Sequence, residues 1–288
     1  NLEIKKYAAI DIGSNAIRVL ISNVIETKEG VYFQKNAFVR APIRLGKDSF
    51  NFGEISKKSL KRIINAMKAY KFLMKVHDVS HYKAFATSAL REANNSSYVI
   101  KTVKKKAGIK VEIIDGTKEA EIIFNSKISE FINTQKTFLF VDVGGGSTEF
   151  TFINGGNHVV SKSFKIGTVR LINNLIDDRV WIGIENWIKK NSMKYEKITL
   201  MGSGGNINKL FKLSNIKEGK PLSKIKLSQL FKQLEKLNYE ERVLKFELNP
   251  DRADVIVPAA RIYLKALEWS GGQKIYVPRF GLSDGMIK

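Results

Sequence analysis

A seven-residue pattern that occurs twice is the feature that most limits what this chain can fold into. Tyr7-Ala8-Ala9-Ile10-Asp11-Ile12-Gly13 is matched by Phe138-Leu139-Phe140-Val141-Asp142-Val143-Gly144, and in both places a small polar turn and an alternating apolar run follow. The two aspartates are separated by about one domain length. We therefore expect two related domains, residues 1–125 and 126–288, which pack around a shared ligand-binding cleft.

The rest of the chain indicates an α/β fold, because short apolar runs alternate with helical periodicity. Residues 7–24 are predicted to form a strand, a tight turn and a second strand. Ser56 is a predicted N-cap, followed by apolar residues at helical spacing. Further predicted elements are a strand at 83–86, a helix at 97–107, a strand at 111–114 and a helix from 116 through 131.

The net charge narrows the class of partner. The 288 residues include 49 Lys+Arg and 28 Asp+Glu, which gives a formal net charge of +21. Such a positive field suits polyanions, so nucleic acid, an anionic membrane and phosphate-rich small molecules all stay open. A compositional bias toward lysine is the alternative. Clustered lysines at 57, 58 and 61, at 104–106 and at 224 and 226 are expected on solvated helix faces, where together they could guide a long polyanion.

Other classes of chemistry are excluded or disfavoured by what the sequence lacks. It contains no cysteine, which removes disulfides, thiolate metal sites and cysteine nucleophiles. Its three histidines have no metal-ligand spacing, and we expect them to be structural. No apolar run approaches the ~20 residues needed to cross a bilayer, and the first residues lack the apolar core of a signal peptide. We expect a cytoplasmic protein without a membrane partner.

The strongest candidate site is the glycine loop at residues 142–149. Three consecutive glycines, Gly144, Gly145 and Gly146, leave backbone N–H groups open to form a concave anion site, and Ser147 and Thr148 add hydroxyl donors. Asp142 and Glu149 flank the loop, and carboxylates so close to phosphates call for a bridging hard cation such as Mg²⁺. A glycine-rich hairpin turn with a capping aspartate is the alternative interpretation. The spacing matches neither a Walker loop nor a dinucleotide fingerprint.

The first repeat offers a counterpart. Asp11 ends its strand, and Ser14, Asn15 and Arg18 supply donors around the turn. Taken alone, this pattern is better explained as a surface hairpin turn. Because it occurs in both halves of the chain, we favour two anion-binding turns that together hold one chain of phosphates.

Three other segments are open to two interpretations. Arg91 lies where a strand leads into a helix, which suits either a phosphate contact or structural capping. The acids of Gly116–Glu121 either reach the cleft or compensate a helix dipole. Residues 201–206 form a further glycine turn, followed by Lys209, which either binds phosphate or allows close helix packing.

Four ordered motifs resemble those of the exopolyphosphatase/guanosine pentaphosphate phosphohydrolase family. They are Ala9–Asn15, Ala86–Ala93, Gly116–Ala120 and Val141–Glu149, and the later segments Arg252-Ala253-Asp254 and Gly281-Leu282 also match. The resemblance implies duplicated ribonuclease H-like domains of the actin/Hsp70/sugar-kinase superfamily.

The resemblance also implies an activity, the hydrolysis of a terminal phosphoanhydride bond in inorganic polyphosphate or guanosine pentaphosphate. It makes Glu119 the acid that activates water, with Lys118 in place of the family's preceding glutamate, where it could lower the pKa of Glu119. Asp142, Glu149 and Asp11 would hold the divalent metal. Phosphate would be bound by Ser14, Asn15, Arg18, Arg91, Gly144, Gly145, Gly146, Ser147 and Thr148.

Two differences from the family pattern bear on substrate choice. The family's Gly-Leu-Arg-Glu-Gly reads Gly281-Leu282-Ser283-Asp284-Gly285 here, and the helical C-terminal extension of longer members is absent from this sequence. We expect an exopolyphosphatase that acts on short or medium chains, and we rank polyphosphate above the pentaphosphate because of the charge. A non-catalytic binding protein and a kinase of the same superfamily are the other hypotheses. A homodimer is compatible with the resemblance, and any nucleic-acid binding is expected to be independent of sequence and sensitive to salt.

Overall fold

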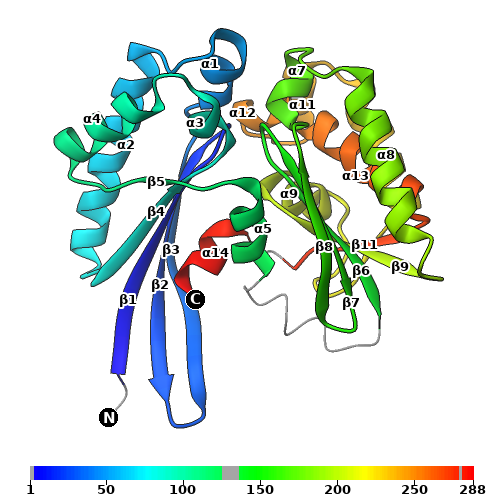
Figure 1. Cartoon of the computed structure of the whole chain (residues 1–288), viewed down its shortest axis with the longest axis horizontal. Coiled ribbons are helices and arrows are strands. Elements are labelled where there is room, and N and C mark those ends of the chain that lie inside the picture. Colours follow the sequence, from blue (N-terminus) through cyan, green and yellow to red (C-terminus); the bar gives the residue numbers. More distant parts are fainter. Residues whose placement is uncertain (1–2, 125–135, 279–280) are drawn as a thin grey trace. The chain divides into compact units, whose positions relative to one another are not determined.

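The chain forms two compact units in a computed structural model that describes residues 3–124, 136–278 and 281–288 (Figure 1). The first unit contains residues 3–124 together with 281–288, and the second contains residues 136–278. The expected boundary between residues 125 and 126 lies outside the described residues, as does the predicted end of the helix that begins at Gly116. The domain limits 1–125 and 126–288 stay a prediction.

The first unit is built on a five-stranded sheet of order β3-β2-β1-β4-β5. The strands β1, β2 and β3 are antiparallel neighbours, whereas β4 and β5 run parallel to β1. Its elements are β1 (Glu3–Ile12), β2 (Ile17–Thr27), β3 (Gly30–Ala41), α1 (Leu45–Phe52), α2 (Lys57–Val76), β4 (His81–Ala86), α3 (Ser88–Glu92), α4 (Ser96–Ala107), β5 (Glu112–Ile113), α5 (Gly116–Phe124) and α14 (Leu282–Ile287).

The second unit has a six-stranded sheet of order β10-β11-β9-β6-β7-β8. Again three antiparallel strands, β6, β7 and β8, are followed across the sheet by the parallel strands β9 and β11. Its elements are β6 (Thr137–Val143), β7 (Thr148–Asn154), β8 (Asn157–Phe164), α7 (Thr168–Ile172), α8 (Asp178–Ser192), β9 (Ile198–Ser203), α9 (Gly205–Leu213), β10 (Leu222–Ser223), α10 (Lys224–Lys236), α11 (Tyr239–Lys245), α12 (Pro250–Ala253), α13 (Ile256–Ser270) and β11 (Lys274–Tyr276).

The two units repeat one topology, which confirms the α/β class and the duplication that the sequence predicts. In each, a strand–turn–strand hairpin lies inside the sheet, a third antiparallel strand flanks it, and a short helix follows that strand. Antiparallel strands can be joined by tight turns, whereas the parallel strands need helical crossovers. The repeated seven-residue pattern thus marks β1 and β6, the strand of each sheet that pairs antiparallel on one side and parallel on the other.

In each unit, helices cover a face of the sheet. In the first unit Ile10, Ile12 and Val19 belong to a core shared with Leu60, Ile63 and Met67 of α2. These α2 residues recur at helical spacing, so the helix turns one apolar side to the sheet. As predicted, α2 begins after Ser56, whose side chain accepts a hydrogen bond from the Ser59 N–H. In the second unit α13 is nearly enclosed and packs with α8, α9 and α10.

The C-terminal helix α14 belongs to the first unit. It packs against β1, β2 and α5, and Leu282 and Met286 are buried. Gly285 lies so close to the Ile122 carbonyl that a Cβ atom would overlap it, which explains a glycine at this position. Asp284 accepts from the Gly281 N–H at 3.0 Å and pairs with Lys35 at 2.7 Å. The Ser283-Asp284 departure from the family pattern thus supplies a helix cap.

Within the described residues, none of the helices combines the length and apolar character that a bilayer crossing requires.

Candidate phosphate-binding turns and acidic pair

The glycine loop between β6 and β7 is fixed by the start of α7. The N–H groups of Thr168 and Val169 donate to the carbonyls of Gly144 and Gly145 at 3.0 and 2.8 Å. The Arg170 guanidinium donates to the Gly146 carbonyl at 2.7 Å. All three carbonyls of the loop therefore point toward α7.

This arrangement turns three backbone N–H groups in the opposite direction. In a trans peptide the N–H points away from the preceding C=O, so the N–H groups of Gly145, Gly146 and Ser147 face away from α7. Among the described residues, none of these three N–H groups donates to a protein acceptor. Convergent N–H groups of this kind form an anion-binding concavity. The loop fits the phosphate-binding role that the sequence predicts for Gly144–Gly146.

The hydroxyls of Ser147 and Thr148 are used within the protein. Ser147 Oγ donates to Glu149 Oε1 at 2.7 Å, and Thr148 Oγ1 donates to the Ile166 carbonyl at 2.6 Å. Both side chains are buried. We therefore expect Ser147 to offer an anion its backbone N–H, with its hydroxyl holding Glu149 in place.

Asp142 and Glu149 form an acidic pair. They are direct cross-strand partners in the antiparallel β6–β7 ladder, so their side chains leave the same face of the sheet. Glu149 is only 2% exposed, and its Oε1 also accepts from Ser163 Oγ at 2.8 Å. Sequence inspection missed Ser163, because it lies on β8 and joins the site only through sheet register. Two hydroxyls thus orient the Glu149 carboxylate beside that of Asp142.

The turn between β9 and α9 approaches Asp142 from the same unit. Gly204 has φ of 103°, and a Cβ there would lie 3.2 Å from Asp142 Oδ1. Arg252 donates to the Gly205 carbonyl. Burial, aided by Lys212 and Arg252, lowers the pKa of Lys209, whose Nζ lies 3.4 Å from the Glu247 carbonyl. The sequence allowed two interpretations of this turn, phosphate binding or close helix packing. The structure shows that the turn is tightly packed and that Lys209, Lys212 and Arg252 lie near it.

The corresponding turn of the first unit follows the same design. The N–H groups of Gly46 and Arg44, at the start of α1, donate to the carbonyls of Ser14 and Asn15 at 2.8 and 2.9 Å. Ser14 Oγ shares a 2.8 Å hydrogen bond with Ser88 Oγ, and both serines are buried. Ser88 is a residue that the candidate set omitted, although its motif was noted. In both units, therefore, the helix after the third strand holds the carbonyls of the turn.

Asp11 and Arg18 occupy the positions in the first unit that Asp142 and Glu149 occupy in the second. They are cross-strand partners in the β1–β2 ladder, and Arg18 Nη1 pairs with Asp11 Oδ2 at 2.5 Å. Asp11 is buried, and the Arg18 side chain is 28% exposed. The carboxylate that we expected to bind metal is here neutralised by an arginine.

Glu119 lies in the first turn of α5. Asp115 caps this helix by accepting from the Lys118 N–H at 2.7 Å, and Glu119 itself is half-buried. Lys118 pairs with Glu121 at 3.0 Å. The ammonium group that we expected to influence Glu119 is therefore held by the next acid of the helix.

Arg91 is anchored at the end of α3. Its Nη1 donates to the Ile114 carbonyl at 2.8 Å, which ties α3 to the segment before α5. A guanidinium carries five N–H donors, so this bond fixes the side chain without using all of them. Both the structural and the phosphate-binding interpretations of Arg91 fit this geometry.

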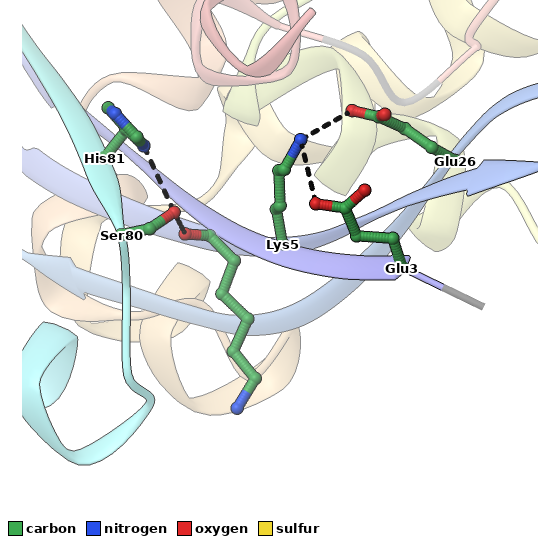
Figure 2. Close-up of polar contacts among 6 residues, drawn as sticks. Glu3, Lys5, Glu26, Ser80 and His81 are labelled. Atoms are coloured by element: carbon green, nitrogen blue, oxygen red, sulfur yellow. Dashed lines mark hydrogen bonds and ion pairs between the residues drawn. The ribbon is translucent and has the colours of Figure 1, made fainter. Parts of the chain in front are cut away.

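Two of the three histidines make side-chain contacts within the protein. His81 bonds to Ser80 Oγ at 3.2 Å and packs edge-on against the Tyr7 ring; Figure 2 shows the His81–Ser80 contact beside Lys5, which bridges Glu3 and Glu26. His158 lies 2.7 Å from Ser161 Oγ. Hydrogen bonding raises the pKa of Lys5, with the bond to Glu3 as the larger cause and the bond to Glu26 as the next. Glu3, Lys5 and Glu26 lie at the opposite end of the β1–β2 ladder from Asp11.

Comparison with known proteins gives a consistent match. Residues 24–288 match the Ppx/GppA phosphatase family. The chain is 31% identical, over 94% of its length and 44% of the other's, to a bifunctional 3-dehydroquinate synthase/phosphatase of Fusobacterium nucleatum. It is 32% identical to exopolyphosphatase 2 of Mycobacterium tuberculosis, over 59% of this chain and 54% of that protein. The chain spans about half the length of these curated relatives.

Solved structures share the whole fold. An exopolyphosphatase from Cytophaga hutchinsonii superposes with a TM-score of 0.85 at 25% identity, covering 98% of this chain and 96% of the other. The Aquifex aeolicus member of the Ppx/GppA family gives a TM-score of 0.77 at 26% identity, covering 99% and 97%.

Proposed function

The chain belongs to the Ppx/GppA phosphatase family, and on that premise we propose that it is a Mg²⁺-dependent exopolyphosphatase that releases terminal phosphate from inorganic polyphosphate. The observation that carries this proposal is the glycine loop of the second unit. It combines three N–H groups turned away from α7 with an oriented pair of carboxylates. Phosphoryl transfer depends mainly on positioning and charge neutralisation, which these two features supply.

The acidic pair suits a divalent cation. Asp142 and Glu149 are facing carboxylates, and like charges directly opposite in a sheet are destabilising unless something neutralises them. Oxygen ligands from one or two carboxylates, completed by phosphate oxygens, are typical of Mg²⁺ sites. When bound, the ion would neutralise charge that develops on the phosphate oxygens. Ser147 and Ser163 keep Glu149 in the orientation that such binding requires.

The remaining residues have separate roles in the proposed reaction. We assign Glu119 as the group that takes the proton of the attacking water, a role open to a carboxylate in hydrogen-bond reach of that water. The turn at Ser14 and Asn15, with Arg18 and Arg91, binds further phosphates of the chain. The reaction requires Glu119 and the metal-binding pair to act on one phosphorus atom, so loss of either should abolish turnover.

Phosphate release from defined substrates tests the proposal. We expect Mg²⁺-dependent release from tripolyphosphate and long polyphosphate, and Glu119→Gln to lower kcat by about 10²-fold or more. Glu121→Gln is the matched control, because it makes the same change two residues away on the same helix, and it should keep full activity. If phosphate were released from guanosine pentaphosphate but not from any polyphosphate, the pentaphosphate would replace polyphosphate as the proposed substrate. Tight binding without release from any substrate would favour a binding protein. The homodimer and sequence-independent nucleic-acid binding stay predictions.

A further inference from the structure

Two helices of the first unit carry a concentration of exposed lysines. Helix α2 has six lysines and α4 has four, all exposed, and neither helix contains an acidic residue. We call this surface the α2–α4 lysine face, made of Lys57, Lys58, Lys61, Lys68, Lys71, Lys75, Lys101, Lys104, Lys105 and Lys106.

The ten lysines form one surface because the two helices pack against each other (Figure 1). Their apolar sides belong to the same core, with Ile63 and Met67 from α2 and Val99 and Val103 from α4. The lysines must therefore lie on the outer side of the helix pair. Within the described part of the chain, none of them forms an ion pair. None of the ten positive charges is therefore neutralised by a direct ion pair, although the Asp48 carboxylate lies at the N-cap of α2, where it accepts from Ser56.

This face begins at the phosphate-binding turn of the same unit. Ser14 accepts from the Gly46 N–H of α1, and the Gly53 carbonyl at the other end of α1 accepts from the Asn94 N–H at 2.8 Å. The Asn95 side chain then bonds both backbone groups of Ile55, at 2.8 and 2.9 Å. Helix α1 therefore links the turn to the N-terminal ends of α2 and α4.

From that edge the charges continue along the unit. Lys57, Lys58 and Lys61 lie in the first turns of α2, whereas Lys75 and the Lys104–Lys106 run lie in the last turns of α2 and α4. A 20-residue helix is about 30 Å long. A flexible polyanion held by one end at the Ser14 turn can reach the near lysines and then follow the helices.

We propose that the α2–α4 lysine face binds the distal part of a long inorganic polyphosphate chain whose end occupies the catalytic site. This inference rests on the proposed function and assigns to it a preference for long chains, in place of the short or medium chains expected from the sequence. Each phosphate carries charge and none carries a base, so a row of lysine point charges is sufficient for recognition.

The side chains on the face favour polyphosphate over nucleic acid. The arginine of α2, Arg62, donates its guanidinium to the backbone carbonyls of Ile43 and Pro42 at 3.1 and 2.7 Å. The face consequently offers mainly lysine ammonium groups, and few arginine guanidinium groups that could form bidentate hydrogen bonds with base edges. Phe72 and Val76 are exposed at the far end of α2, where an anionic membrane could use them. Continuity with the phosphate turn is what favours polyphosphate.

Lysine substitutions test the proposal. In the test variant Lys101, Lys104, Lys105 and Lys106 are replaced by Gln, which keeps helix propensity. The matched control removes the same charge from exposed helix positions of the second unit, by replacing Lys190, Lys226, Lys232 and Lys236 with Gln. The binding of polyphosphate chains of about 100 phosphate units is measured by filter retention across a series of salt concentrations. EDTA is present to chelate divalent cations and so prevent turnover.

We expect the test variant to bind long polyphosphate at least about 10-fold more weakly than the wild type, with a log–log salt slope about 3 units shallower. The control should change by less than about 3-fold, and both variants should release phosphate from tripolyphosphate at the wild-type rate. Equal weakening in both variants would overturn the proposal, because only net charge would then matter.

Competing polyanions separate the remaining outcomes. Preference for single-stranded RNA or for phosphatidylserine vesicles over polyphosphate, lost in the test variant, would overturn the assignment of the partner. Failure of the proposed function has a different signature. In that case no substrate releases phosphate, while binding of long polyphosphate in EDTA still depends on the α4 lysines.

Discussion

Asp142 and Glu149 face each other directly across β6 and β7, at the register position where the first unit pairs Asp11 with Arg18. One repeat therefore neutralises its acid internally, whereas the other sets two carboxylates side by side. The sequence suggested a metal-binding role for Asp11, Asp142 and Glu149 alike, and this difference separates Asp11 from the other two. The pair in the second unit suits a metal, and we now expect Asp11 chiefly to orient Arg18.

Replacing one acid of the facing pair should remove the metal response. We expect Mg²⁺ to raise the Tm of the wild type and to leave that of Glu149→Gln unchanged. Without Mg²⁺ the variant should be as stable as the wild type or more stable by about 0.2–1 kcal/mol, because facing like charges repel. Differential scanning fluorimetry with and without Mg²⁺ checks both points. An equal Mg²⁺ shift in the two proteins would contradict the assignment.

Removing the arginine of the other pair should cost stability. Arg18→Gln leaves the buried Asp11 carboxylate without its cation, and we expect a loss of about 3 kcal/mol in the free energy of unfolding. Asp11→Asn combined with Arg18→Gln should recover most of that loss. Urea unfolding of both single variants and the double variant measures the coupling. Additive losses would show that the two side chains do not stabilise one another.

The glycine loop should depend on a glycine outside it. A Cβ atom at Gly167 would overlap backbone atoms of Gly145 and Gly146, which cannot move aside as a flexible side chain can. Gly167→Ala should therefore destabilise the protein by about 1–3 kcal/mol and weaken phosphate binding. The control is Gly183→Ala on α8, where nothing lies within 4 Å, and it should be neutral or stabilising by about 0.5–1 kcal/mol. Thermal unfolding and phosphate titration distinguish them.

Stability at high pH should depend on Tyr70. Its hydroxyl donates to the Ile17 carbonyl at 2.9 Å, and burial raises its pKa to about 12. The folded protein therefore holds this proton where the unfolded chain, with a pKa near 10, has lost it. The free energy of unfolding should fall by about 2–3 kcal/mol more between pH 10 and 12 than it does for Tyr70→Phe. Parallel pH profiles of the two proteins would contradict the role of this proton.

Local patterns in the sequence were sufficient to predict several elements. The hairpins at Asp11 and Asp142, the helix after Ser56 and the helix at 97–107 all depend on residues close together in the chain, and each was found. Periodicity and capping report such short-range interactions directly. The same reasoning identified the glycine loop, because three consecutive glycines have a local conformational consequence.

Contacts between distant segments could not be read in this way. The hydroxyl of Ser163 reaches Glu149 through the β7–β8 register, and Gly167 fits against the loop only after α7 docks. The return of α14 to β1 and β2 joins segments more than two hundred residues apart. Hydrophobic burial is non-directional, so the apolar pattern of α14 does not specify which sheet it covers.

By itself, the sequence determined that the protein is a duplicated α/β chain with an acid and a polar turn at the centre of each half, because strand patterning and turn chemistry are local. The tertiary structure decided which acid is neutralised and which is left for a metal. Cross-strand register places Arg18 opposite Asp11 but Glu149 opposite Asp142. It also decided which way the loop N–H groups face, because the helix after the third strand binds the carbonyls on the other side.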